Sequence, residues 1–123
     1  MSELRTDTIT ASDGTSPVTL TKQSAAKAWV HWDGESTASI RDSFNFSSLS
    51  DTGTGDYTFS YTTSQADGTY SSVVSASRTS NAQGLIACST TFNTGNIDSI
   101  SINDGGSAED TENGCLTVHG DLA

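Results

Sequence analysis

The chain has 123 residues, which fits a single domain. Its 15 Asp and Glu outnumber its 5 Lys and Arg, and the net charge of −10 argues against binding to nucleic acid or to anionic membranes, which need basic patches. Only 33% of the residues are hydrophobic, while roughly a third are Ser or Thr, so we expect oligomerisation to supplement a small core.

Residues 1–24 are predicted to form an extended arm that precedes the folded domain. The arm has four apolar anchors, separated by a turn cluster that carries the single proline: Leu4, Ile9, Val18 and Leu20. Two interpretations are open. The arm is either a frayed terminus or an anchor that pairs with a larger partner.

Residues 26–61 hold most of the large apolar side chains. Strict alternation, with Gly and Asp at the turns, predicts antiparallel strands around 28–32, around Ile40 and from Tyr57 to Tyr61. We expect the following side chains in the core or in a subunit interface: Trp29, His31, Trp32, Tyr57, Phe59 and Tyr61. A carbohydrate-binding platform of Trp29, Trp32 and Tyr57 is the alternative, but packing is favoured because all three lie inside strands.

Further strands are predicted at 70–76, 85–92, 97–102 and 115–119, with polar loops at 62–68, 78–84, 93–96 and 103–114. Short strands at this spacing indicate an all-β fold, a small antiparallel sandwich or barrel. The predicted domain therefore covers residues 25–123.

The amino-acid sequence of the first half resembles that of a known family. The segments are AKAWVHWDG, SIRDSFNFSS and DTGTGDYTFSYTT, and the lead-in LRTDTI is similar too. Together they resemble a β-domain of tail fibres and related surface appendages of tailed phages, of the marine and cyanobacterial type. The resemblance covers residues 4 to about 63. It implies a virion surface protein, a homotrimer, whose residues 1–24 attach to other virion proteins of the tail or capsid.

No catalytic motif accompanies the resemblance, and we expect no enzyme activity, metal or cofactor. Cys88 and Cys115 are expected to be buried free thiols, with a disulfide as the alternative. The acidic segment 104–112 is expected to be a solvated loop, and calcium binding is the weaker interpretation, since the spacing matches no standard site.

Recognition is assigned to two polar loops, because a rigid β scaffold tolerates variation there. The candidate receptor-facing residues are Arg78, Asn81, Gln83, Asp104, Glu109 and Asp110. The favoured function is a trimeric fibre or knob on the particle that binds a host glycan or receptor. A capsid decoration or head-fibre protein is the main alternative, and a secreted calcium-dependent adhesin is a more distant one.

The sequence has no run of about 18 apolar residues, so membrane insertion is not expected. It also lacks a basic start followed by an apolar stretch. We therefore expect assembly in a host cytoplasm and exposure on the released particle.

Overall fold

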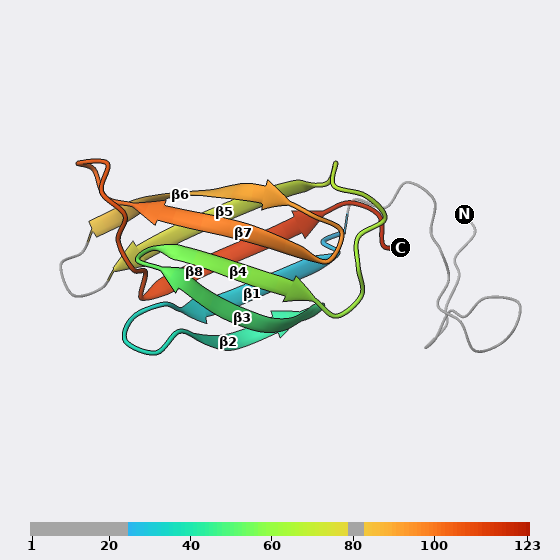
Figure 1. Ribbon diagram of the computed structural model, residues 1–123, viewed down its shortest axis with the longest axis horizontal. Coiled ribbons are helices and arrows are strands. Elements are labelled where there is room, and N and C mark those ends of the chain that lie inside the picture. Colours follow the sequence, from blue (N-terminus) through green and yellow to red (C-terminus); the bar gives the residue numbers. More distant parts are fainter. Residues whose placement is uncertain (1–24, 79–82) are drawn as a thin grey trace, which may run out of the picture.

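A computed structural model describes residues 25–78 and 83–123 (Figure 1). The regular secondary structure of these residues consists of β-strands alone. The strands are β1 (Ala28–Asp33), β2 (Ser39–Phe44), β3 (Phe46–Gly53), β4 (Asp56–Tyr61), β5 (Ser71–Arg78), β6 (Gln83–Phe92), β7 (Asn96–Ile102) and β8 (Asn113–His119). The all-β expectation is confirmed. The proposed anchors Leu4, Ile9, Val18 and Leu20 lie outside the described residues.

All strand pairs are antiparallel, in the order β2-β1-β8-β5-β6-β7-β4-β3. β2 and β3 follow each other in the chain but lie at opposite ends of this order, and they contact each other. The sheet therefore curls into a nearly closed barrel, with little free edge for pairing with other chains.

Asn45 forms the corner at which the chain turns from β2 into β3. Its φ of 59° is in the left-handed region, which Asn tolerates better than most residues. The side-chain amide donates to the carbonyls of Lys27 and Thr63, and its oxygen accepts from the Thr63 amide at 2.7 Å. One side chain thus joins the start of β1, the β2–β3 corner and the end of β4. The sequence predicted one strand around Ile40 in this region, whereas the structure has two, β2 and β3.

Inward-facing side chains of alternate residues build the core. Its buried members are Ala28, Val30, Trp32, Phe46, Tyr57, Phe59, Tyr61, Tyr70, Ile97, Leu116 and Val118. The aromatic rings meet mostly edge to face, with centroids 4.8 Å apart for Trp32 and Phe59 and 5.9 Å apart for Trp32 and Tyr57. This geometry suits the quadrupoles of the rings and fixes their relative positions.

The antiparallel order gives the barrel two different ends. The start of β1, the end of β8 and the C-terminus lie at one, which we call the terminal end (Figure 1). The connections β1–β2, β3–β4 and β7–β8, together with the end of β5 and the start of β6, lie at the other, which we call the loop end (Figure 1). Residues 1–24 therefore join the barrel at the end opposite these connections.

Candidate functional site

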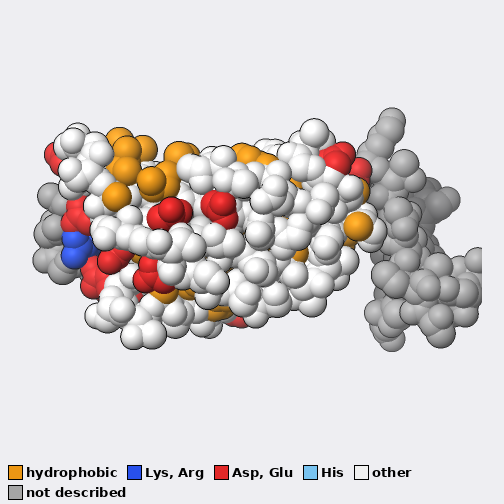
Figure 2. All heavy atoms as spheres, viewed as in Figure 1, with side chains coloured by type: hydrophobic (Ala, Val, Ile, Leu, Met, Phe, Trp, Pro, Cys, Tyr) orange, Lys and Arg blue, Asp and Glu red, His pale blue; other side chains and the backbone are white. Residues whose placement is uncertain are grey.

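The loop end is held together by an ion-pair cluster around Arg78. Its guanidinium pairs with Glu35 of the β1–β2 loop at 3.0 Å and also with Glu109 of the β7–β8 loop. All three side chains are partly buried, so solvent screens these pairs less than pairs on an open surface. In Figure 2 the basic atoms at this end are surrounded by acidic ones. The cluster ties two loops to the end of β5.

A second set of contacts lies beneath the β7–β8 loop. Asp110 accepts a hydrogen bond from the Gly55 amide at 2.7 Å and another from the Tyr57 hydroxyl at 3.3 Å. The Tyr57 oxygen in turn accepts from the Thr111 amide at 3.2 Å. Burial, with the nearby Asp110 carboxylate adding to it, raises the pKa of Tyr57 well above its usual 10.0. The phenol stays neutral and holds the loop in place.

These contacts determine what the candidate receptor-facing residues can do. Arg78, Glu109 and Asp110 already have partners inside the fold. The sequence placed Arg78 and Gln83 in a loop, which is wrong: they are paired in β5 and β6. The strand alternation simply continues further than the polar composition indicated.

Two candidates of this group remain. Asp104 is exposed at the tip of the β7–β8 loop, where the Asn103 side chain accepts hydrogen bonds from the Gly105 and Ser107 amides. Asn81 lies outside the described residues. Asp104 is therefore the carboxylate of the set that is free to meet a partner.

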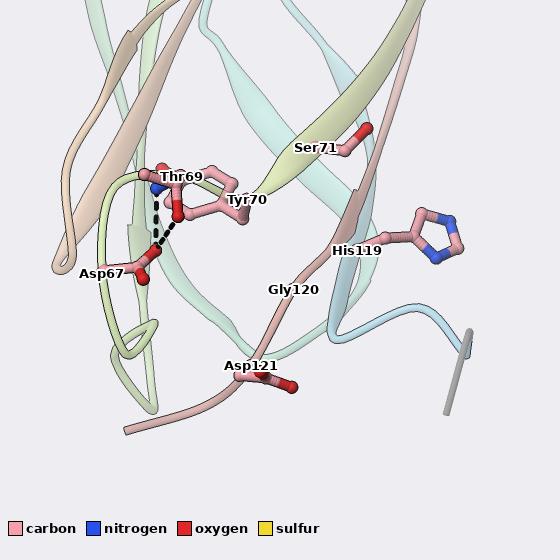
Figure 3. Close-up of a pocket in the computed structure, with 7 residues that line it drawn as sticks. All are labelled: Asp67, Thr69, Tyr70, Ser71, His119, Gly120 and Asp121. Atoms are coloured by element: carbon pink, nitrogen blue, oxygen red, sulfur yellow. Dashed lines mark hydrogen bonds between the residues drawn. The ribbon is translucent and has the colours of Figure 1, made fainter. Parts of the chain in front are cut away.

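A shallow hollow of about 270 Å³ lies at the terminal end. Its lining consists of Asp67, Thr69, Tyr70, Ser71, His119, Gly120 and Asp121 (Figure 3). Asp67 accepts hydrogen bonds from the Thr69 amide and hydroxyl, which hold the pKa of Asp67 below its usual value. In Figure 3 the His119 ring points away from Asp67, so the titratable groups do not converge on one point.

The described residues contain no group of three or more His, Cys, Asp or Glu side chains arranged to hold a metal ion. Nor do residues 25–78 and 83–123 include a helix long and apolar enough to cross a membrane. The hollow lies at the end of β8, whose Val118 carbonyl accepts a hydrogen bond from the Lys27 amide just before β1.

The six residues expected in the core or an interface divide between the two faces of the sheet. Trp32, Tyr57, Phe59 and Tyr61 are buried inside the barrel. Trp29 is 37% exposed on the outside of β1, and His31 lies on the same face. The alternative of a carbohydrate-binding platform of Trp29, Trp32 and Tyr57 is therefore wrong, because Trp32 and Tyr57 point into the barrel and Trp29 points outward.

Both cysteines are free, as expected, but they are exposed, so the expectation of buried thiols is wrong. In β8 the inward positions belong to Leu116 and Val118, which places Cys115 outside. Cys115 is paired with His31 of β1 and with Ser75 of β5. Cys88 lies on the outer face of β6 and is paired with Ile100 of β7.

Two features at these surfaces were missed in the sequence. The first is Asn45, for which an Asn between two aromatic residues was the available signal. The second is the set of exposed apolar residues Phe44, Val73 and Ile86. The adjacent pair Val73-Val74 could have indicated it, because in a strand one of two neighbours must face outward.

Comparison of the chain with protein-family models, with curated proteins and with solved structures found no match.

Proposed function

We propose that this chain is a non-enzymatic structural protein of a tailed-phage virion, a trimeric surface fibre or receptor-binding knob that attaches through residues 1–24. The observation that carries the proposal is the polarity of the barrel. Residues 1–24 join at the terminal end, and the three described connections β1–β2, β3–β4 and β7–β8 lie at the opposite, loop end. A domain tethered at one end presents the other to its surroundings.

The rigidity of the loop end also favours a binding role. The Arg78 ion pairs and the Asp110 contacts with Gly55 and Tyr57 fix the connections β1–β2, β3–β4 and β7–β8 before any partner arrives. A preordered surface loses less conformational entropy on binding than a loose one. Trimeric presentation would add avidity on a repeated glycan or receptor even where each contact is weak.

A capsid decoration or head-fibre role is the second candidate, and one observation favours it. At the loop end Arg78, Glu109 and Asp110 use their charged groups inside the fold, which leaves fewer of them for a receptor. A protein that stabilises a shell mechanically needs an anchor and a rigid body, and its outer loops need bind nothing.

Labelling the chain on intact particles tests the proposal and separates the two candidates. We expect label at the tail for a fibre and at the head for a decoration protein. Absence of the chain from purified particles would contradict both. Preincubating host cells with the purified protein should block infection only if it binds a receptor, and Asp104→Lys should then weaken the block.

The attachment role of residues 1–24 needs its own variant. Leu4→Ser combined with Ile9→Ser should abolish incorporation into particles while the fluorescence of the buried Trp32 stays unchanged. The matched control is Thr6→Ser with Thr8→Ser, which leaves the apolar anchors in place and should be incorporated normally. Normal incorporation of the Leu4 and Ile9 variant would show that attachment uses another surface.

A further inference from the structure

The outside of the barrel carries a row of apolar side chains across six neighbouring strands. Trp29 of β1 is paired with Phe44 of β2 on one side and with Thr117 of β8 on the other, and Thr117 is paired with Val73 of β5. Their side chains share one face because paired residues point the same way. Phe44 is 51% and Val73 65% exposed.

The row continues onto β6 and β7. Ala76 of β5 is paired with Leu85 of β6, and the Ser72 and Ser89 hydroxyls meet at 2.6 Å, so the same register brings Val73 opposite Cys88. Cys88 is paired with Ile100. Beside them Ile86, 61% exposed, is paired with Ile102.

We call this surface the outer apolar band. It consists of Phe44, Trp29, Thr117, Val73, Cys88, Ile100, Ile86 and Ile102. Figure 2 shows hydrophobic atoms at the surface over β6 and β7, where the band ends. Its other end, on β1 and β2, is aromatic.

The core does not need these side chains, because the inward positions of the same strands already fill the barrel. From the exposed fractions, and with roughly 150–250 Å² for each large side chain, the band keeps about 400 Å² of apolar surface in water. Where the two opposite ends of the band meet between two copies, they together place about 400 Å² of apolar surface at the centre of an interface, which in a standard complex buries roughly 1,600 Å² in total.

Charge indicates what covers the band. The chain has a net charge of −10, so two copies repel each other wherever their carboxylates meet. No member of the band is charged, and by register the neighbouring carboxylates, Asp42, Asp56 and Asp98, lie along its borders. The band is thus where two copies can approach with least repulsion, whereas a basic partner would prefer the acidic remainder of the surface.

We infer that the outer apolar band is the contact between copies of this chain, with the aromatic end of one copy packed against the isoleucine end of the next. The inference rests on the trimer in the proposed function and names the surface that builds it. A head-to-tail contact of two different patches is the kind that closes rings of three. Cys88, which lies beside Ile100 at the isoleucine end of the band, becomes inaccessible when copies assemble.

The test uses the full chain in a Cys115→Ser background, so that Cys88 is the single thiol. Sedimentation gives the mass, and a thiol reagent reports the exposure of Cys88. We expect a multiple of 12.8 kDa with a protected thiol. Phe44→Lys and Ile86→Lys, each at an exposed outward position, should be 12.8 kDa monomers with a reactive thiol. Ser50→Lys, exposed on β3 away from the band, is the matched control and should assemble normally.

Mixing the two variants tests the head-to-tail arrangement. Each retains the patch that the other lacks, so an equimolar mixture should form a dimer and stop there. If both variants keep the assembled mass, copies meet at another surface, and the inference fails while the trimer stands. If the unmodified chain is a monomer with a reactive Cys88, both fail, and particle labelling still decides the virion role. A monomer with a protected Cys88 would assign the band to the chain's own residues and overturn the inference.

Discussion

At the scale of single residues, Gly114 packs directly against the indole ring of Trp32 in the core. These residues are paired across β1 and β8, and a β-carbon on Gly114 would overlap the indole ring. Gly114→Ala should therefore lower the free energy of unfolding by about 2–3 kcal/mol, since neither the strand nor the buried ring can move aside. Chemical denaturation followed by Trp fluorescence measures it.

The control for this substitution is Gly53→Ala, because no atom lies within contact distance of a β-carbon there. Its unfolding free energy should stay close to that of the unmodified chain. Equal effects of the two substitutions would mean that Trp32 does not pack on Gly114.

Three buried tyrosines make stability depend on alkaline pH. Burial raises the pKa of Tyr57, Tyr61 and Tyr70 above the usual 10.0. Below pH 10 the phenols are neutral in both the folded and the unfolded chain, and their burial contributes fully to the free energy of unfolding. Above pH 10 only the unfolded chain releases the protons readily, so stability falls as pH rises. Denaturation between pH 8 and about 11.5, with tyrosinate absorbance measured in parallel, should show this decline. Phenolate formation before unfolding would contradict it.

The part of the fold that the sequence predicted best is the side of a strand on which each side chain lies. The alternation from Tyr57 to Tyr61 correctly indicated that Tyr57, Phe59 and Tyr61 share one side of β4. The cysteines were misplaced because Cys is usually buried, and that preference was given more weight than the position of Cys115 between inward-facing neighbours. For the receptor-facing set, composition suggested exposure, while Asp110 has partners far away in the sequence.

At the scale of elements, the β2–β3 corner combines backbone strain and hydrogen bonding in Asn45. Asn45→Gly keeps the positive φ available but removes three side-chain hydrogen bonds, and should cost about 1–2 kcal/mol of stability. Asn45→Ala should cost about 1 kcal/mol more, because alanine disfavours the left-handed region. Thermal unfolding of the two variants gives the comparison. If Ala is tolerated better than Gly, strain at the corner is unimportant.

The loops at the loop end are coupled through Arg78. Arg78→Gln leaves Glu35 and Glu109 facing each other, so we expect a loss of about 1–2 kcal/mol that shrinks as salt is added. The double variant Arg78→Gln, Glu109→Gln removes one of the two repelling charges and should recover part of the loss. Denaturation in low and high salt tests both. A loss independent of salt would assign the effect to packing of the arginine stem.

The element pattern was predicted well for isolated strands and poorly where tertiary contacts decide. The strands near Tyr57, Val74 and Ile97 follow directly from alternation with turn residues between them. The division of residues 39–53 into β2 and β3 depends on Asn45 reaching Lys27 and Thr63, and no local pattern encodes such distant partners.

At the scale of the whole molecule, the order of the strands in the sheet could not be predicted from the sequence. The first and last strands, β1 and β8, are neighbours, so the barrel cannot close until the end of the chain is available. Pairings this distant in sequence slow folding, since a long loop must close first. We expect refolding in the millisecond to second range, as is usual for β-barrels, and stopped-flow fluorescence of Trp32 would measure it.

The two-ended layout also decides how the barrel bears mechanical force. A load between Ala25 and the loop end pulls along β1, so its ladders with β2 and β8 resist in shear, all rungs at once. A load between Ala25 and Ala123 separates β1 from β8 one residue pair at a time, starting at Ala28 and Val118. The pairs break in sequence because the chain enters β1 and leaves β8 at the same, terminal end. A tether through residues 1–24 with resistance at the far tip therefore loads the molecule in its strongest direction.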